Sequence, residues 1–220
     1  MAKKTVILGV IVVAIVVGVA ASVSSSTSET VNLDMGRTHG TISTSMGSAI
    51  LGNPSAPITI VEFGDYQCHQ CYNWFHNTKP AITRDYIETG KTNFVFVDLA
   101  FLGNDSPKTS QASYCAEDQG RYWDYHNLLY TSQEPKIDGG WANSERLKAF
   151  AFSLSLDMDL FGSCLDSGKY SKRVQYNIQQ AKNHDVRGTP GFFIVGPDGQ
   201  QQISGAQPFS VFKQILDPMI

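Results

Sequence analysis

The chain has 220 residues and a formal net charge of −3 at pH 7. Its length suggests one domain with an extension, and its content of 42% hydrophobic and 17% charged residues is ordinary for a globular protein. Because a protein that binds nucleic acid normally presents a strongly basic surface, the near-balanced charge argues against a nucleic-acid partner.

The first feature along the chain is an apolar segment, residues 6–23, that contains no charged side chain. A helix of this length reaches roughly 27 Å, which is enough to cross the hydrocarbon core of a membrane. Two lysines precede the segment and the first charge after it is Glu29, so the positive-inside rule places residues 1–5 in the cytoplasm and the remainder of the chain outside. The alternative is a signal peptide cleaved after Val19-Ala20-Ala21. We favour a retained transmembrane anchor, because the segment is longer than the apolar region of a usual signal peptide, and either segment exports the domain to a compartment where disulfides persist.

Residues 24–47 are rich in Ser, Thr and Gly and show almost no apolar periodicity. This composition is typical of a flexible linker, which would hold the following domain near the membrane. A short strand over Gly40–Ser45 is compatible with part of the segment. From about residue 48 the pattern becomes globular, and we expect one domain over residues 48–220.

The domain begins with a strand, a helix and a second strand. Ile58–Phe63 is an apolar run that predicts a buried strand, and Phe94–Val97 predicts another. Between them, apolar residues at helical spacing predict a helix over Cys71–Tyr86, which Pro80 should kink.

A long helical stretch, about residues 107–185, follows the second strand. Ser106-Pro107 provides a helix start, with the hydroxyl as cap and the proline in the first turn. Glycines separate further helical segments, which are Trp123–Tyr130, Ser144–Ser153, Met158–Leu165 and Ser171–Asn183.

The chain closes with a strand hairpin and a helix. Phe192–Val195 and Gln201–Ser204 predict two strands joined by a turn at Pro197-Asp198-Gly199, and Phe209–Leu216 predicts the last helix. The order is therefore a β-α-β unit and a β-β-α unit separated by a helical insertion. It predicts an α/β fold with a mixed central sheet flanked by helices.

Cys68-His69-Gln70-Cys71 lies between the first strand and the first helix. Two residues between the cysteines place both sulfur atoms at the first turn of the helix, where an exchangeable disulfide can close. The helix N-terminus favours negative charge, so it lowers the pKa of Cys68 and makes this thiol the candidate nucleophile. Cys71, one turn deeper, is the candidate resolving thiol of a redox-active disulfide. A structural disulfide and half of a zinc site are the alternatives.

Four parts of the domain carry a family resemblance that extends over nearly all of residues 48–220. They are Leu51–Pro57 with Glu62–Cys68, then Cys115-Ala116 with Gln119-Gly120 and Trp123, then Cys164-Leu165, and finally Gly188–Phe193. On these residues the chain resembles the DsbA type of thiol–disulfide oxidoreductase, which has a thioredoxin-like fold with an inserted helical subdomain. One departure is the dipeptide His69-Gln70, where DsbA itself has Pro-His. These two residues tune the thiolate and thus the redox poise.

Glu62 and His69 are further candidate site residues beside the two cysteines. Glu62 stands in an otherwise apolar strand, and the resemblance implies a buried acid that accepts or relays the proton of Cys71. An outward-facing side chain on an edge strand is the alternative. His69 is a candidate to donate a hydrogen bond to the Cys68 thiolate, or to stabilise it by charge when protonated. Here the alternative is a solvated loop histidine.

Thr189-Pro190 is the second part of the candidate site. The resemblance implies a cis peptide bond at this position, facing Cys68 in space. Such a loop leaves the backbone of Thr189 free to pair with an extended substrate peptide, as an added strand would. The alternative is an ordinary trans turn before the third strand.

The remaining cysteines, Cys115 and Cys164, both lie in the helical insertion. In an exported domain two such cysteines usually pair, and we expect a structural disulfide. The loop of about 50 residues that it closes would stabilise the fold by about 4 kcal/mol in the chain-entropy model. A second redox pair that relays electrons, and two free buried thiols, are the alternatives.

Together, the export segment and the resemblance imply a membrane-tethered enzyme that forms disulfides in secreted proteins. Its partners would be unfolded or thiol-containing exported proteins and a membrane redox partner that recycles it, and we expect neither a cofactor nor a metal. A reductase or isomerase fed by a membrane electron donor is a second hypothesis. A third, in which the cysteines and His69 hold zinc in a non-enzymatic extracytoplasmic binding module, is disfavoured by the wide spacing of the cysteines.

Overall fold

A computed structural model describes residues 40–220 of the chain. The predicted anchor at residues 6–23 and the greater part of the predicted linker lie outside the described residues. Within residues 40–220, no helix combines the length and the apolar character needed to cross a membrane. The described residues comprise the whole of the predicted domain and the last part of the linker.

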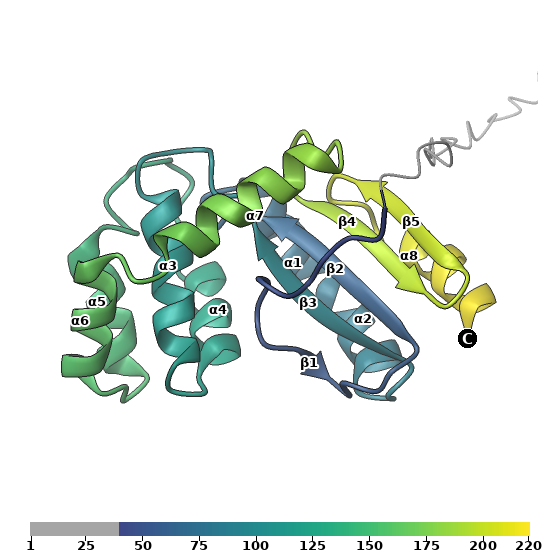
Figure 1. Ribbon diagram of the computed structural model, residues 1–220, viewed down its shortest axis with the longest axis horizontal. Coiled ribbons are helices and arrows are strands. Elements are labelled where there is room, and N and C mark those ends of the chain that lie inside the picture. Colours follow the sequence, from purple (N-terminus) through teal and green to yellow (C-terminus); the bar gives the residue numbers. More distant parts are fainter. Residues whose placement is uncertain (1–39) are drawn as a thin grey trace, which may run out of the picture. The chain divides into compact units, whose positions relative to one another are not determined.

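The fold is built on a five-stranded sheet with the order β1-β3-β2-β4-β5 (Figure 1). The strands are β1 (Leu51–Gly52), β2 (Ile58–Gly64), β3 (Thr92–Asp98), β4 (Gly191–Gly196) and β5 (Gly199–Ser204). β2 and β3 pair in parallel, whereas the other three pairs of neighbours are antiparallel. The prediction of a mixed sheet is confirmed, and each predicted strand is present with slightly extended ends.

The predicted helix over Cys71–Tyr86 is divided in the structure. It consists of α1 (His69–Asn77), α2 (Lys79–Ile82) and a π-helical turn, η1 (Thr83–Ile87). The break falls at Thr78, two residues before Pro80. A proline has no N–H to donate to the carbonyl four residues earlier, and its ring crowds the preceding turn, so the interruption lies on the N-terminal side of Pro80.

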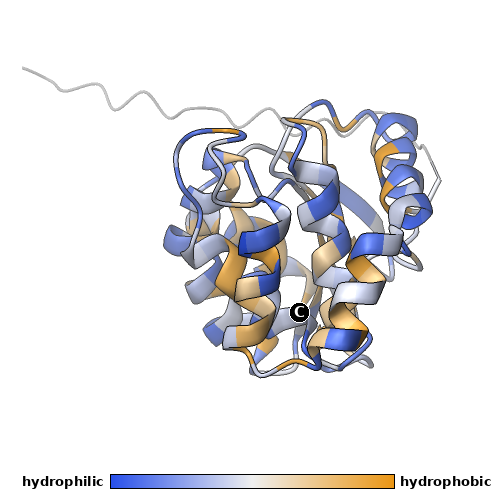
Figure 2. Cartoon of the chain, turned by 90° about the vertical axis from the view of Figure 1, so that its left-hand side faces the viewer, coloured by the Kyte–Doolittle hydropathy of each residue, from blue (hydrophilic) through white to orange (hydrophobic). Residues whose placement is uncertain are grey.

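The helical insertion lies between β3 and β4. Its helices are α3 (Ser106–Glu117), α4 (Tyr122–Thr131), α5 (Ser144–Ser153), α6 (Met158–Ser167) and α7 (Ser171–Asn183). α3 to α6 gather beside one end of the sheet, and α7 returns across a face of the sheet (Figure 1). Seen from the end of the insertion, the helices carry hydrophobic stripes next to hydrophilic ones (Figure 2), the pattern of helices that bury one face.

Local sequence explains where these helices begin and end. The side chain of Asn143 accepts a hydrogen bond from the Arg146 N–H at the start of α5, and Asp157 caps α6 in the same way. Gly168 ends α6 with φ of 65°, a left-handed conformation that glycine adopts without steric cost. The predicted insertion and the observed helices agree to within about two residues at either end.

The two faces of the sheet form separate clusters of buried side chains, because alternate residues of a strand point to opposite faces. On the first face, Ile60, Phe96 and Phe192 pack with Trp74 of α1 and with Phe212 of α8 (Phe209–Leu216). The second face is covered by α7 and by the chain around residue 42, and its members are Ile42, Val61, Phe63, Val95, Val97, Leu99, Ala181, Val186 and Phe193. The central strands β2 and β3 are therefore buried on both sides.

Residues 40–50 run along the second face as an irregular segment (Figure 1). The N–H of Ser48 donates to the carbonyl of Phe96 at 2.8 Å. A Cβ at Gly47 would lie 2.6 Å from a methyl group of Val95, so only glycine allows this approach to the sheet. The structure describes no strand over Gly40–Ser45.

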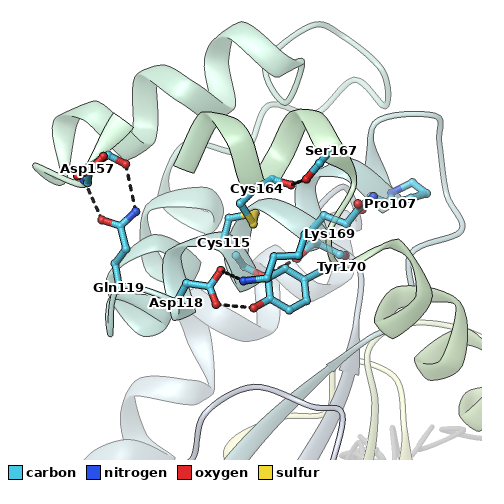
Figure 3. Close-up of a disulfide and its surroundings, with 12 residues drawn as sticks. Pro107, Cys115, Asp118, Gln119, Asp157, Cys164, Ser167, Lys169 and Tyr170 are labelled. Atoms are coloured by element: carbon cyan, nitrogen blue, oxygen red, sulfur yellow. Dashed lines mark hydrogen bonds and ion pairs between the residues drawn. A yellow bond between two sulfur atoms is a disulfide. The ribbon is translucent and has the colours of Figure 1, made fainter. Parts of the chain in front are cut away.

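A disulfide joins Cys115 of α3 to Cys164 of α6, whose Cα atoms are 5.8 Å apart (Figure 3). Polar contacts surround it. Asp118 accepts hydrogen bonds from Lys169 at 2.7 Å and from the Tyr170 hydroxyl at 2.5 Å. The bond and these contacts fix the helices of the insertion to one another.

Candidate active site

Cys68 is the N-cap residue of α1, with its backbone in an extended conformation. Its thiol and that of Cys71 are both free. Cys68 is 7% exposed and Cys71 is fully buried. The sequence predicted this order, in which the first sulfur faces the surface and the second lies one turn deeper.

The surroundings pull the acidities of the two thiols apart. The hydrogen bond from the Cys71 thiol, aided by the N–H groups of Gln70 and Cys71 at the start of α1, lowers the pKa of Cys68 to about 6. Burial, with a further contribution from Cys68 and Glu62, raises the pKa of Cys71. At neutral pH the pair therefore consists of a Cys68 thiolate and a protonated Cys71.

Thr189 and Pro190 lie against the first cysteine. The Thr189–Pro190 peptide bond is cis. The Cys68 sulfur lies 3.2 Å from the carbonyl oxygen of Thr189, to which the protonated thiol donates a hydrogen bond. The structure thus brings together two segments that lie 121 positions apart in the chain.

Glu62 occupies the centre of the sheet. It lies on β2 opposite Phe96 of β3 and Phe192 of β4. β2 therefore has a neighbouring strand on each side, and the alternative that Glu62 faces outward from an edge strand is wrong. The side chain is 2% exposed, and its Oε1 has no hydrogen-bond partner among the described residues. Burial raises the pKa of this carboxyl group, and the charge of Lys79 opposes the rise. Glu62 can therefore hold a proton near neutral pH.

Lys79 is a candidate site residue that the sequence analysis missed. Its side chain is 6% exposed, and its Nζ lies 4.7 Å from the ring centre of Phe75 and 5.2 Å from that of Trp123. Burial lowers the pKa of Lys79, and Glu62 opposes that change. A signal was present in the sequence, because Lys79 follows Phe75 by four positions and so lies on the buried face of the predicted helix.

His69 lies on the exposed surface of α1. Its ring is parallel to that of Tyr72, with the ring centres 5.7 Å apart. Among the described residues, no hydrogen bond joins His69 to Cys68. The structure therefore places His69 beside Cys68 but does not contain the hydrogen bond to the Cys68 sulfur that the sequence had suggested.

The cysteines do not form a four-ligand metal site. Cys115 and Cys164 are bonded to each other, so their sulfur atoms are not free to join Cys68 and Cys71 around one ion. Residues 40–220 hold no group of three or more Cys, His, Asp or Glu side chains arranged to bind a metal. The arrangement instead supports thiol–disulfide exchange.

The family model for thioredoxin matches residues 44–218. The chain belongs to the thioredoxin family. Disulfide bond formation protein D of Bacillus subtilis is 29% identical over 151 residues, which cover 67% of this chain and 68% of that protein. A probable disulfide bond formation protein D of Bacillus anthracis is 28% identical over 150 residues, 66% of this chain and 69% of the relative.

Solved structures of related proteins have the same fold as this chain. The crystal structure of oxidised BdbD from Bacillus subtilis matches with a TM-score of 0.74 at 25% identity, over 82% of this chain and 96% of that one. Alpha-DsbA1 of Wolbachia pipientis has the same fold, with a TM-score of 0.68 at 23% identity over 77% and 89% of the two chains. The chain is a thiol–disulfide oxidoreductase of the DsbA type, and thiol-containing proteins are its substrates.

Proposed function

We propose that the protein introduces disulfide bonds into exported proteins while tethered to the outer side of a membrane. The observation that carries the proposal is the asymmetry of the dithiol, in which an acidic Cys68 lies above a buried and weakly acidic Cys71. An acidic first thiol stabilises the reduced state, and a stable reduced state makes the disulfide a stronger oxidant. The names of the relatives, disulfide bond formation protein D, agree with this direction.

The proposed reaction begins from a disulfide between Cys68 and Cys71. A substrate thiolate attacks the Cys68 sulfur, the disulfide breaks, and its electron pair passes to the Cys71 sulfur. Because Cys71 is buried, its thiolate must take up a proton, and Glu62 is the candidate donor. A second substrate thiolate then attacks the substrate sulfur of the mixed disulfide and releases Cys68 as a thiolate.

Each turnover leaves the enzyme reduced. Two electrons pass from the substrate dithiol to Cys68 and Cys71, so a redox partner must remove two electrons before the next cycle. We assign this step to a partner in the membrane. During the exchange, the main chain of Thr189 would pair with the extended substrate peptide beside the Cys68 sulfur.

The proposed location rests on two features. The apolar segment at residues 6–23 is long enough to serve as an anchor, with residues 24–47 as tether. The disulfide between Cys115 and Cys164 suits an oxidising compartment outside the cytoplasm. Fractionation of cells and the intact mass of the protein test this: a membrane-bound chain that begins at its first residues supports the anchor, and a soluble chain shortened after Ala21 contradicts it.

The departure at His69-Gln70 keeps one competitor open, a reductase or isomerase that uses the same dithiol. The reduction potential of Cys68 and Cys71 separates the two directions. The purified protein is equilibrated in glutathione buffers, the thiols are trapped, and mass analysis of peptides distinguishes this pair from Cys115 and Cys164. A potential of about −180 mV or higher supports the disulfide donor, whereas a potential near about −270 mV contradicts it and supports a reductase.

A further inference from the structure

The loop between α4 and α5, residues 132–143, belongs to the insertion but reaches the active-site loop at residues 65–68. The side-chain amide of Gln133 donates hydrogen bonds to the carbonyl oxygens of Tyr66 at 2.5 Å and of Cys68 at 3.2 Å. An amide –NH2 group has two N–H donors, so these two contacts use both of them. The carbonyl group of the nucleophile and that of the residue two positions before it are thus held by one side chain from another part of the fold.

Asp138 of the same loop holds the residue that precedes Cys68. Its N–H donates to Oε1 of Gln67 at 2.7 Å, and its carboxylate accepts from Nε2 of Gln67 at 3.0 Å. The carboxylate also accepts from the N–H groups of Asn104 and Asp105. Asp138 has a φ of 52°, which is unfavourable for a residue with a side chain, and the four hydrogen bonds offset that cost. Gln67 is 3% exposed, so the contact is largely shielded from water.

These contacts help to determine where the Cys68 sulfur lies, together with the hydrogen bonds that Asp65 accepts from the N–H groups of Gln67 and Cys68. Cys68 is the first residue before α1, and its sulfur is stabilised by N–H groups in the first turn of that helix. The strength of such bonds falls steeply with angle, and a short side chain follows its own backbone closely. Fixing the carbonyls of Tyr66 and Cys68 also prevents their negative ends from turning toward the thiolate. The insertion therefore controls the geometry on which the first thiol depends.

We propose that Gln133 and Asp138 are positioning residues that hold the Cys68 sulfur against the amide groups of α1 and so set its reactivity. The proposal rests on Cys68 as the attacking thiol, and it applies equally to a disulfide donor and to a reductase. Neither residue takes part in proton or electron transfer. Their effect reaches the sulfur through the backbone of residues 66–68.

The test is a thiolate titration of the reduced full-length protein, followed by absorbance at 240 nm. Gln133→Met removes both donors at similar side-chain volume. We expect the pKa of Cys68 to rise by about half a unit or more, and alkylation of Cys68 below its pKa to slow about threefold. The equilibrium with glutathione should shift toward the disulfide by a similar factor. Burial keeps Cys71 out of the low-pH part of the titration.

A matched control removes a hydrogen bond from the same helix pair without touching the active-site loop. Tyr125→Phe deletes the bond from the Tyr125 hydroxyl to the carbonyl of Leu147 at 2.8 Å. We expect both variants to lower the melting temperature, and only Gln133→Met to move the titration. An unchanged titration in Gln133→Met, together with a lower melting temperature, would reduce the loop to a structural support and overturn the proposal.

Asp138→Asn provides a second and independent variant, because asparagine tolerates the left-handed backbone. Loss of the negative charge by itself would favour the Cys68 thiolate and lower its pKa. A rise in the pKa of Cys68 would therefore show that Asp138 positions the sulfur through Gln67, and a fall would contradict the proposal. The titration requires neither substrate nor recycling partner, so its outcome is separate from the reduction potential that tests the proposed function.

Discussion

Removal of the disulfide in the insertion should cost a large part of the stability of the domain. The bond joins residues 49 positions apart, and the chain-entropy model gives about 4 kcal/mol for a loop of this length at 25 °C. For a domain of this size, that loss corresponds to a fall of about 8 to 16 °C in the melting temperature. Cys115 is 1% exposed and Cys164 is 8% exposed, so replacement by alanine also removes buried contacts and adds to the loss.

The assay compares melting temperatures in a background with Cys68→Ser and Cys71→Ser, where a reducing agent cannot alter the active site. Cys115→Ala/Cys164→Ala is measured against the parent, and the parent is also measured after chemical reduction. The reduced parent keeps its sulfur atoms and loses only the cross-link, so it isolates the entropic part. A fall of less than about 3 °C in both samples would refute the reasoning, because it would mean that packing and the surrounding polar contacts hold the helices without the bond.

Further predictions concern the titrating groups. Because the hydrogen bond from the Cys71 thiol is the largest cause of the acidity of Cys68, Cys71→Ala, which has no side-chain donor, should raise the pKa of Cys68 above about 6, as measured by the pH dependence of alkylation. Glu62→Gln should slow disulfide transfer to a model peptide by about 10²-fold while leaving the alkylation of Cys68 close to that of the parent, since it removes the proton donor for Cys71. Lys79→Met should raise the pKa of Glu62 further, because the lysine charge opposes the effect of burial, and the pH profile of transfer should move to higher pH. Burial raises the pKa of Asp98 from 3.8 to about 6, so the folded state binds the Asp98 proton more tightly than the unfolded state does. The protonated carboxyl group therefore contributes most to stability below about pH 4. This contribution, about 3 kcal/mol in total, is lost as the pH rises through about 6. Asp98→Asn should remove this pH dependence in urea unfolding, and an unchanged profile would exclude Asp98 as its source.

The local pattern of the sequence was sufficient to predict the helices and strands and to identify Cys68 and Cys71 as a dithiol. The apolar runs of β2 and β3 and the turn residues between β4 and β5 carry their signal within a few positions. The acidity expected of Cys68 also depends on a local feature, the N-terminus of the helix that follows it. Glu62 was recognisable as a candidate site residue because a carboxylate in an apolar strand is costly to bury and is therefore unusual there.

Other features depend on contacts between distant parts of the chain. The proximity of Cys68 to Thr189 was expected only from a resemblance. The pairing of Cys115 with Cys164 was expected from the export of the domain and is confirmed, but its geometry is set by how α3 and α6 pack. The break at Thr78 depended on how far the effect of Pro80 extends into the preceding turn.

Gln133 and Asp138 could not be assigned from sequence alone, and for Lys79 the sequence offered only its spacing from Phe75. A lysine becomes a buried neighbour of Glu62 only when α1 and α2 pack on the sheet and the insertion closes over them. A glutamine or an aspartate in a polar loop is ordinary in any sequence, and its meaning depends on the acceptor that it meets. Sequence thus determined the local elements and the chemistry of the dithiol, because these depend on neighbours along the chain. The tertiary structure decided which polar side chains surround the dithiol, because hydrogen bonds and burial depend on distances between parts of the chain that no local pattern encodes.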